Sequence, residues 1–443
     1  MNRALIQRLY DRQFFGIVPG LETTRALLAT LGNPERTLGV IHVAGTNGKG
    51  SVSAMVSTGL CEAGLATGLY TSPHLVKLNE RFCIQGTPID DEAMDALLAE
   101  IEAAAESVEA RTGRRATFFE CTTAAAFLWF QRRGVRIAVV ETGLGGRLDA
   151  TNVVTPLLSV ITPIALDHQA YLGDTVEAVA AEKAGIVKPG RPVVMAAMDA
   201  KAEAVIRQYA HSVNAPLIAV GDTVTVRRAS GDWKAQKVNV ASVSQEYGTL
   251  TTPLSARYQL GNIATAVAVL ETLQDTLGLP LPETCVAAAL KKVRWPGRFQ
   301  MVADNPPLLL DGAHNPHGAA ALADAVEAVL HRRPPAERRV AIVAGVCADK
   351  DAEGFFRAIA SVAGHVWAVP VPNPRGLPPD DTAALARRFR LAAETAPSLR
   401  DALSPARAWA TEHGTAVIVC GSLFLVGAAL IDPFGSLHGM DDG

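Results

Sequence analysis

The sequence predicts an α/β protein whose main sheet is mostly parallel. Short apolar runs without alternation recur along the chain and end in glycine or polar residues, and longer segments with helical spacing separate them. Strands of this kind are typical of a parallel sheet that helices cover on both faces. The runs are 40–44, 66–71, 137–142, 157–162 and 192–197, and the helical segments are 51–63, 91–110, 122–132 and 175–183.

The length and a change of pattern predict two domains. The chain has 443 residues, of which 49% are hydrophobic, and this is longer than a single core usually grows. From 217 to about 254 the stretches alternate, which predicts a small antiparallel excursion before a helix over 262–277. Proline and glycine interrupt the pattern at 293–300, and a second series of strands follows at 308–311, 339–346, 366–371 and 416–420. We therefore expect domains at 1–294 and 295–443.

Composition favours small-molecule chemistry. The formal net charge of -3, with acids and bases mixed, offers no basic stripe for nucleic acid. Six cysteines without a CxxC pair, and no apolar leader after Met1, predict a reduced, cytoplasmic protein. The apolar stretch 416–431 is shorter than a membrane span and is broken at Gly421-Ser422, so we expect a strand, a turn and a helix there.

The stretch "HVAGTNGKGS", residues 42–51, is typical of a phosphate-binding loop. A strand enters a glycine-rich turn and a helix follows, so that backbone N–H groups and the helix N-terminus face the phosphates. Lys49 would neutralise phosphate charge, and the hydroxyl of Ser51 could reach Mg²⁺. The spelling is unusual because Gly50 separates the lysine from the hydroxyl residue. A plain strand-to-helix turn explains the three glycines and the lysine less well.

Polar side chains follow three further strands, at the edge where ligands gather in open α/β sheets. Ser72 or His74 in "TSPHL" could be a ligand, although a loop turn explains that motif equally well. Glu141 ends a buried strand before "TGLGG" and is a natural Mg²⁺ ligand; the alternative is a structural pair with Arg147. His168 follows the next strand, as a metal ligand or as an ordinary loop histidine.

The remaining candidate residues are Lys183 and three residues that follow the domain boundary. Lys183 lies near the end of an alanine-rich helix, where a buried amine must be paired or modified; a solvated surface lysine is the alternative. Arg298 follows the domain boundary, and "LLLDGAHNPHG" places Asp311 and His314 at a strand end. Pro316 between two histidines favours a turn over a zinc site.

These motifs together resemble the folylpolyglutamate synthase and dihydrofolate synthase group of the Mur ligase superfamily. The resemblance runs in order from about Gly20 to about Gly427. It implies an N-terminal P-loop ATPase domain with a mostly parallel, Mur ligase-like sheet and a smaller C-terminal Rossmann-like α/β domain. The segments that carry it are "GLETTRALLATLGNP", "IHVAGTNGKGS", "TSPHL", "NER", "TFFE", "ETGLGGRLDATN", "DH", "EKAGI", "PGRF", "DGAHNPH" and "CGSLFLVG".

By this resemblance the protein is an ATP-dependent acid–amino-acid ligase that adds L-glutamate to dihydropteroate, to reduced folates, or to both. The substrate carboxylate would attack the γ-phosphate of ATP to give an acyl phosphate, which the amine of glutamate would displace. The chemistry needs positioning and charge neutralisation more than a protein nucleophile, and the sequence offers no Ser-His-Asp or Cys-His arrangement. ATP and two Mg²⁺ ions are the expected cofactors, and a monomer without nucleic-acid or membrane partners is expected.

The resemblance also implies roles for individual residues. The catalytic group would be Lys49, Glu141, His168 and Lys183, the last as a carbamate. The metals would be held by Ser51, Ser72, Glu141 and His168. ATP would be contacted by Thr46, Asn47, Gly48, Lys49, Gly50, Ser51, Asn262, Arg298, Asp311 and His314. The pterin would be contacted by Thr117, Phe118, Phe119, Glu120, Leu148, Asp149 and Ala150.

Two departures from the family pattern bear on these roles. Bifunctional relatives often have an aspartate where this chain has Val18, which weakens the dihydropteroate assignment. In "RYQLGN", Tyr258 stands where relatives more often have histidine, while Gln259 and Asn262 are retained. A folylpolyglutamate synthase without dihydropteroate activity, a cell-wall Mur-type ligase and an ATPase-type switch remain the alternatives.

Overall fold

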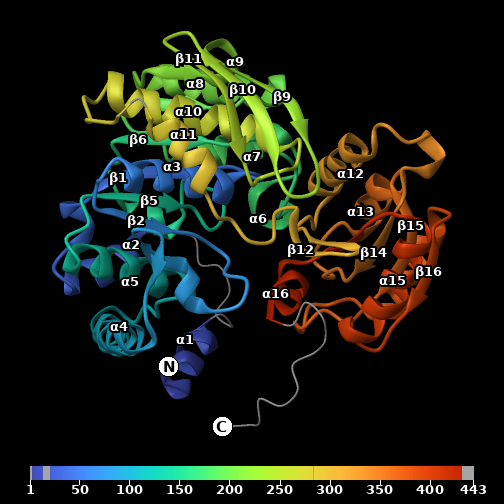
Figure 1. Ribbon diagram of the computed structural model, residues 1–443. Helices are drawn as coiled ribbons and strands as arrows, with labels where there is room; N and C mark the ends of the chain where they lie inside the picture. Colours follow the sequence, from blue (N-terminus) through green and yellow to red (C-terminus); the bar gives the residue numbers. More distant parts are fainter. Residues whose placement is uncertain (1, 13–19, 283, 432–443) are drawn as a thin grey trace. The chain divides into compact units, whose positions relative to one another are not determined.

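The computed structural model describes residues 2–12, 20–282 and 284–431, so Val18 lies outside the described residues. The chain forms two compact units (Figure 1). Unit 1 takes in 1–226, 240–248 and 261–293, and unit 2 takes in 227–239, 249–260 and 294–443. The second unit thus includes two short segments that precede residue 295, in addition to the C-terminal part of the chain.

Unit 1 is built on an eight-stranded sheet with the order β4-β3-β2-β5-β1-β6-β7-β8. Strands β2, β5, β1, β6 and β7 are parallel, as predicted; β8 is parallel as well, and β3 and β4 extend one edge in antiparallel fashion. The prediction was wrong for 217–219, which form β8 of this sheet rather than part of the antiparallel excursion. The strands are β1 (Gly39–Ala44), β2 (Thr67–Tyr70), β3 (Phe82–Ile84), β4 (Thr87–Pro88), β5 (Ile137–Glu141), β6 (Leu158–Ile161), β7 (Val193–Met195) and β8 (Leu217–Ala219).

Helices cover both faces of this sheet. Val40, Ala138 and Val140 share a core with α4 and α5, and the intervening residues Ile41 and Val139 point to the opposite face, where α3 packs. Helix α5 begins at Phe118, earlier than predicted, because Thr117 caps it. The helices are α1 (Arg3–Asp11), α2 (Glu22–Thr30), α3 (Lys49–Glu62), α4 (Asp91–Thr112), α5 (Phe118–Arg132), α6 (Gln169–Leu172), α7 (Val176–Ala184), α8 (Ala200–Ser212), α9 (Val220–Thr223), α10 (Gln259–Asp275) and α11 (Cys285–Lys292), with short 3₁₀ helices η2 (Pro34–Thr37), η3 (Leu78–Arg81) and η4 (Ala150–Val153).

The predicted antiparallel excursion is a three-stranded sheet with the order β11-β10-β9. Its strands are β9 (Val224–Gly231), β10 (Gln236–Ser242) and β11 (Glu246–Thr252). Because these strands alternate between buried and exposed residues, one face is packed and the other is solvated.

Unit 2 is built on a six-stranded sheet with the order β12-β13-β17-β14-β15-β16. All neighbours are parallel except β12, which pairs antiparallel with β13. The sequence pattern indicated β13, β14, β15 and β17 but not the half-exposed strands β12 and β16. The elements are β12 (Gln300–Asp304), β13 (Pro307–Leu310), α12 (Pro316–Leu330), η5 (Pro335–Glu337), β14 (Val340–Ala344), α13 (Ala352–Ile359), β15 (Ala363–Ala368), α14 (Pro379–Arg388), β16 (Ala392–Thr395), α15 (Leu399–Glu412), β17 (Val417–Cys420) and α16 (Leu423–Ile431).

The apolar stretch 416–431 forms β17, a turn at Gly421-Ser422 and α16, as predicted. Among the helices of the described residues, none combines the length and apolar character that crossing a membrane requires.

Candidate active site

The phosphate-binding loop lies between β1 and α3, as the sequence predicts. Gly48 has a left-handed backbone (φ 89°), and a Cβ there would lie 2.3 Å from Oδ1 of Asn262, so only glycine fits. The backbone N–H groups of Thr46 and Asn47 both donate to the carbonyl of Pro163, at 3.0 and 3.2 Å. The first N–H groups of α3, which have no acceptor within the helix, are therefore the better placed donors for phosphate.

Lys49 is folded back onto its own loop. Its Nζ donates to the carbonyls of Gly45 at 3.1 Å and Thr46 at 3.3 Å, and lies 3.9 Å from Oε1 of Glu141. The side chain is only 17% exposed. A phosphate that entered the loop would offer this ammonium a stronger acceptor than two neutral carbonyls.

Sheet register brings Glu141 and Ser72 together at the carboxyl edge. Val43 of β1 pairs with Glu141 of β5, and β5 also pairs with β2, after which Ser72 follows. The backbone N–H of Ser72 donates to Oε2 of Glu141 at 3.2 Å. The alternative pairing with Arg147 is not what the structure has, because Arg147 pairs with Glu182 at 2.7 Å.

The two remaining residues of the predicted metal set lie at neighbouring strand ends. Ser51 is buried in the first turn of α3. His168 follows β6 with a left-handed backbone, and its ring is 40% exposed and lies 3.9 Å from Oδ1 of Asp167. No group of three or more histidine, cysteine, aspartate or glutamate side chains that could hold a metal occurs among the described residues. A Mg²⁺ site here would therefore combine Glu141 with serine hydroxyls and with His168 at the neighbouring strand end.

Lys183 is buried, which excludes the reading of a surface lysine. The residue is 4% exposed, and its Nζ donates to the carbonyl of Gly45 at 2.8 Å, the same oxygen that Lys49 contacts. Burial, and then the charge of Lys49, lowers the pKa of Lys183 to about 7. A large fraction of this amine is therefore uncharged near neutral pH.

Asp149 organises the glycine-rich loop after Glu141. Its carboxylate accepts hydrogen bonds from the backbone N–H groups of Gly143 (2.9 Å), Leu144 (2.8 Å) and Thr151 (3.0 Å), although burial raises its pKa. Hydrogen bonds from this loop thus use much of the accepting capacity of the Asp149 carboxylate, which was predicted to contact the pterin. Beside it, Leu148 is 38% exposed and Ala150 is buried.

The segment at the start of α5 that was predicted to contact the pterin also uses polar groups in hydrogen bonds within the protein. Thr117 caps the helix, and the carboxylate of Glu120 accepts from the N–H and the hydroxyl of Thr117, at 2.8 and 2.9 Å, and from the hydroxyl of Thr24. Phe118 is buried, whereas Phe119 is half-buried and lies against Gly143, where a Cβ would come within 2.5 Å of the ring. Phe119 and Leu148 are the more accessible members of the predicted set.

In unit 2, Asp311 is buried at the end of β13. Its carboxylate accepts from the N–H of Phe299 (2.9 Å), the N–H of Ala313 (2.8 Å) and the hydroxyl of Tyr258 (2.8 Å). Burial raises the pKa of Asp311 and, with the neighbouring carboxylate, raises that of Tyr258 far above its usual value. Sequence reasoning missed this role of Tyr258, although its departure from the family pattern marked the position.

The other predicted residues of unit 2 surround the same turn. Arg298 donates from Nη1 to the carbonyl of Gly297 at 3.0 Å, and a Cβ on Gly312 would lie 2.7 Å from that nitrogen. His314 donates from Nδ1 to the carbonyl of Gly312 at 2.7 Å, which leaves Nε2 as an acceptor in the neutral ring. The structure therefore brings Arg298, Asp311 and His314 together.

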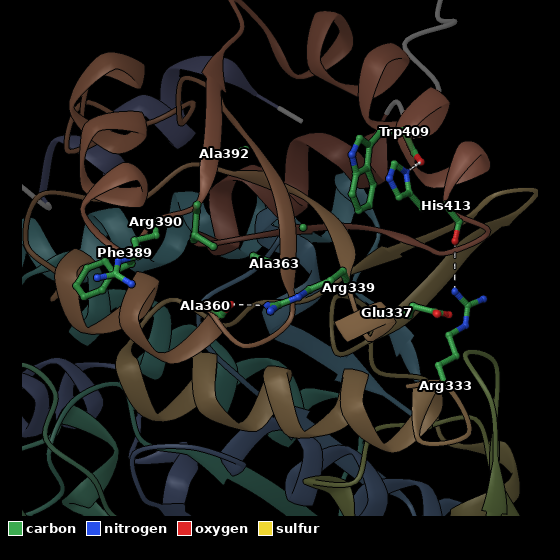
Figure 2. Close-up of a pocket in the computed structure, with 12 residues that line it drawn as sticks. Arg333, Glu337, Arg339, Ala360, Ala363, Phe389, Arg390, Ala392, Trp409 and His413 are labelled. Carbon is green, nitrogen blue, oxygen red and sulfur yellow. Dashed lines mark hydrogen bonds between the residues drawn. The ribbon is translucent and has the colours of Figure 1, made fainter. Parts of the chain in front are cut away.

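A cavity of about 670 Å³ lies at the amino edge of the unit 2 sheet, where β14, β15 and β16 begin (Figure 2). This edge is opposite to the one that carries Asp311. Arginines line it, but Arg333 donates to the carbonyl of His413, and Arg339 donates to the carbonyls of Ala360 and Ser361. None of the predicted site residues lines the cavity. Arg333 and Arg339 thus hold neighbouring backbone segments in place, and the candidate site lies elsewhere.

Comparison with known proteins shows the family of the chain. Residues 43–270 match the model of the Mur ligase middle domain, and residues 297–423 match that of the Mur ligase glutamate ligase domain. A dihydrofolate synthase/folylpolyglutamate synthase of Bacillus subtilis is 36% identical over 80% of this chain and 82% of its own length.

Solved structures are similar over nearly the whole chain. A Mycobacterium tuberculosis folylpolyglutamate synthase complexed with ADP superimposes with a TM-score of 0.88 at 32% identity, covering 98% of both chains. E. coli FolC in complex with DHPP and ADP has a TM-score of 0.84 at 32% identity, also over 98% of both chains. The chain therefore belongs to the Mur ligase family, in the group of dihydrofolate synthases and folylpolyglutamate synthases.

Proposed function

We propose that this ATP-dependent ligase adds L-glutamate to dihydropteroate and also to reduced folates that already carry glutamate. The observation that carries the proposal is the cluster at the carboxyl edge of the unit 1 sheet. There, Lys49 and Lys183 share the carbonyl of Gly45, and Glu141 lies beside Lys49 and the backbone of Ser72. The names of the relatives that match over most of their length support the same substrates.

The arrangement suits phosphoryl transfer from ATP to a carboxylate. A carboxylate oxygen of the pterin substrate attacks the γ-phosphorus, and the bond from that phosphorus to ADP breaks. The amine of glutamate then attacks the acyl carbon, loses a proton and expels inorganic phosphate. Lys49 and the first turn of α3 neutralise and orient the phosphates, which is the main demand of such a transfer.

The donor atoms at the edge fit magnesium. Ser51, Ser72, Glu141 and His168 would hold two Mg²⁺ ions, since hydroxyl and carboxylate oxygens are ligands that Mg²⁺ prefers. The bound ions would supply charge neutralisation between the phosphates and the attacking carboxylate. Thr46, Asn47, Gly48 and Gly50 would shape the loop around ATP, with Asn262, Arg298, Asp311 and His314 as further contacts.

In this proposal, the side-chain amine of Lys183 is converted to a carbamate. A free ammonium next to Lys49 would repel Mg²⁺, whereas the neutral amine, which a pKa of about 7 makes accessible, can attack CO₂. The new N–C bond gives a carbamate anion and releases one proton. The anion would then pair with the cations at this edge.

We further infer that 1–294 form the ATP- and pterin-binding domain and that 295–443 form the glutamate-ligase domain, in a monomer. The pterin contacts would come from Thr117, Phe118, Phe119, Glu120, Leu148, Asp149 and Ala150. The six cysteines are unpaired, which fits a reduced, cytoplasmic setting.

A coupled assay tests the function. Purified protein is incubated with ATP and Mg²⁺, with dihydropteroate or tetrahydrofolate and with L-glutamate, each alone and in pairs. ATP turnover should rise strongly only when a pterin and glutamate are both present, and mass spectrometry should find the glutamyl product. Product with tetrahydrofolate but not with dihydropteroate would restrict the protein to polyglutamylation, and turnover without either acceptor would indicate an ATPase instead.

A further inference from the structure

Arg81 is a buried cation at the carboxyl edge of the unit 1 sheet. It ends η3, directly before β3, and its carbonyl accepts from the N–H of Thr71. The residue is 6% exposed. Its Nε donates to Nδ1 of His74 at 2.9 Å, and its guanidinium carbon lies 5.1 Å from the centre of the Phe118 ring.

The described residues provide no carboxylate that neutralises Arg81 in an ion pair. The adjacent Glu80 does not fill this role, because its carboxylate accepts from the backbone N–H groups of Leu75, Val76 and Lys77 at 2.7–2.9 Å. Burial lowers the pKa of Arg81, as expected for a desolvated cation, and Tyr70, Tyr10 and Glu141 oppose this shift.

The polar side chains that contact Arg81 among the described residues are neutral: the buried hydroxyl of Tyr70, whose pKa burial raises, and the ring of His74. Because Nδ1 of His74 accepts from Arg81, the proton of that ring lies on Nε2, which is 3.2 Å from the hydroxyl of Tyr10. Burial raises the pKa of Tyr10, so its hydroxyl is neutral as well. Within the part of the chain that the structure describes, this cluster therefore carries one positive charge without an ion-pair partner.

Arg12 is another buried arginine of unit 1 and provides a comparison, because its partners are all within the fold. It is 4% exposed, its Nη2 pairs with Glu102 at 2.8 Å, and its Nη1 donates to the carbonyl of Ala116 at 3.0 Å. A buried charge without such a partner destabilises a fold by several kcal/mol. Among the described residues, Arg12 has this partner and Arg81 does not.

The position of Arg81 relates it to the proposed reaction. Tyr70 of β2 pairs with Phe82, the residue after Arg81, and with Val140, the residue before Glu141. Arg81 thus lies at the same sheet edge as Ser72 and Glu141, one strand farther from the phosphate loop. A carboxylate approaching that loop meets repulsion from the phosphates, which a neighbouring cation reduces.

We propose that Arg81 binds the carboxylate of the pterin substrate, the group that is to be phosphorylated, through the planar donor fork of its guanidinium. This inference rests on the proposed function. The guanidinium orients the carboxylate at the sheet edge beside Glu141, and His74 fixes the guanidinium through its Nε. The substrate anion then supplies the charge partner that the fold leaves out.

The test compares dihydropteroate with its carboxamide analogue, in which the acid is replaced by a neutral amide. Binding of each is measured by pterin fluorescence, in wild-type protein and in Arg81→Gln, Arg81→Lys and the matched control Arg12→Lys. Wild-type protein should prefer the acid by about 10- to 100-fold, the range expected for a charge-assisted pair. Arg81→Gln should abolish this preference, Arg81→Lys should reduce it at least about threefold because the fork is lost, and Arg12→Lys should keep it.

The outcomes separate this inference from the proposed function. If wild-type protein ligates glutamate to dihydropteroate but Arg81→Gln keeps the full preference for the acid, Arg81 is only a structural clamp for the loop that contains His74. If Arg81→Gln does not fold, an undiminished preference in a folded Arg81→Lys protein overturns the inference equally. Absence of ligation by wild-type protein would instead contradict the proposed function.

Discussion

The carboxyl edges of the two sheets differ in how their charges are used. At the unit 1 edge, Lys49 and Lys183 both contact one carbonyl oxygen, and Arg81 has no ion-pair partner among the described residues. At the unit 2 edge, the carboxylate of Asp311 accepts three hydrogen bonds from its own surroundings. An edge with surplus positive charge is suited to bind anions, whereas the donors to Asp311 mainly hold that carboxylate in position. Substitutions of the cations at the first edge should therefore reduce activity, and loss of a donor to Asp311 should mainly reduce stability.

The largest effect is expected for Lys49→Ala. Loss of a cation aimed at the transferred phosphate should lower the turnover number by about 10²–10³-fold, as removal of a preorganised donor does elsewhere. Phosphate release in the complete ligation assay measures this. Lys201→Ala is the control, because Lys201 is 73% exposed on α8, and it should keep its rate. If Lys49→Ala lowers the turnover number by less than about tenfold, the proposed difference between the two edges is wrong.

Lys183→Ala should also lose most of its turnover while still folding and binding nucleotide. The reason is that the proposed carbamate anion is absent, so added formate or acetate should restore part of the rate by occupying its place. Initial rates with and without these ions provide the measurement. Near-normal turnover in Lys183→Ala or Lys183→Arg would return Lys183 to a structural role.

The lowered pKa of Lys183 also makes stability depend on pH. Between about 7, the pKa in the folded protein, and 10.5 in the unfolded chain, the unfolded state binds one more proton. The free energy of unfolding should therefore rise with pH in this window, by up to about 1.4 kcal/mol per pH unit from this group. Below pH 7 both states bind this proton, and burial of the charged Lys183 lowers the free energy of unfolding by a constant amount.

Urea denaturation between pH 7.5 and 9.5 in CO₂-free buffer measures the slope. Lys183→Met should be more stable than the wild type at pH 7.5, and the difference should shrink toward pH 9.5. Parallel slopes for the two proteins would show that the buried amine is not the group that titrates.

The smallest effect is expected at the unit 2 edge. Tyr258→Phe removes one of the three donors to Asp311 and should lower the free energy of unfolding by about 1–3 kcal/mol, the cost of an unmatched buried acceptor. Denaturant melts measure this, with Tyr209→Phe on α8 as a control in the other unit. A loss of turnover as large as that of Lys49→Ala, without a loss of stability, would show that both edges act directly in the chemistry.

The sequence was sufficient for the parts of the fold that have strong local patterns. Apolar runs located β1, β2, β5, β6 and β7, and the glycines and lysine after β1 located the phosphate loop. The strands β12 and β16 were missed because half-exposed strands lack a continuous apolar run. The antiparallel assignment of 217–219 was wrong because three residues are too few to distinguish a parallel edge strand from a hairpin.

The candidate site was predictable in its residues but not in how they are used. No spacing rule shows that Asp149 and Glu120 direct their carboxylates at their own loops, since this depends on tertiary hydrogen bonds. The burial of Lys183 against Gly45, which lies far away in sequence, is likewise a property of the folded chain. So is the lack, among the described residues, of a carboxylate that pairs with Arg81.

Oxygen transfer tests the central claim, that the unit 1 edge activates a carboxylate as an acyl phosphate. Dihydropteroate labelled with oxygen-18 in its carboxylate is converted with ATP and L-glutamate, and the inorganic phosphate is analysed by mass spectrometry. Because one carboxylate oxygen becomes the bridge to phosphorus and leaves with it, each phosphate should carry one labelled oxygen. Unlabelled phosphate formed together with the glutamyl product would contradict this account.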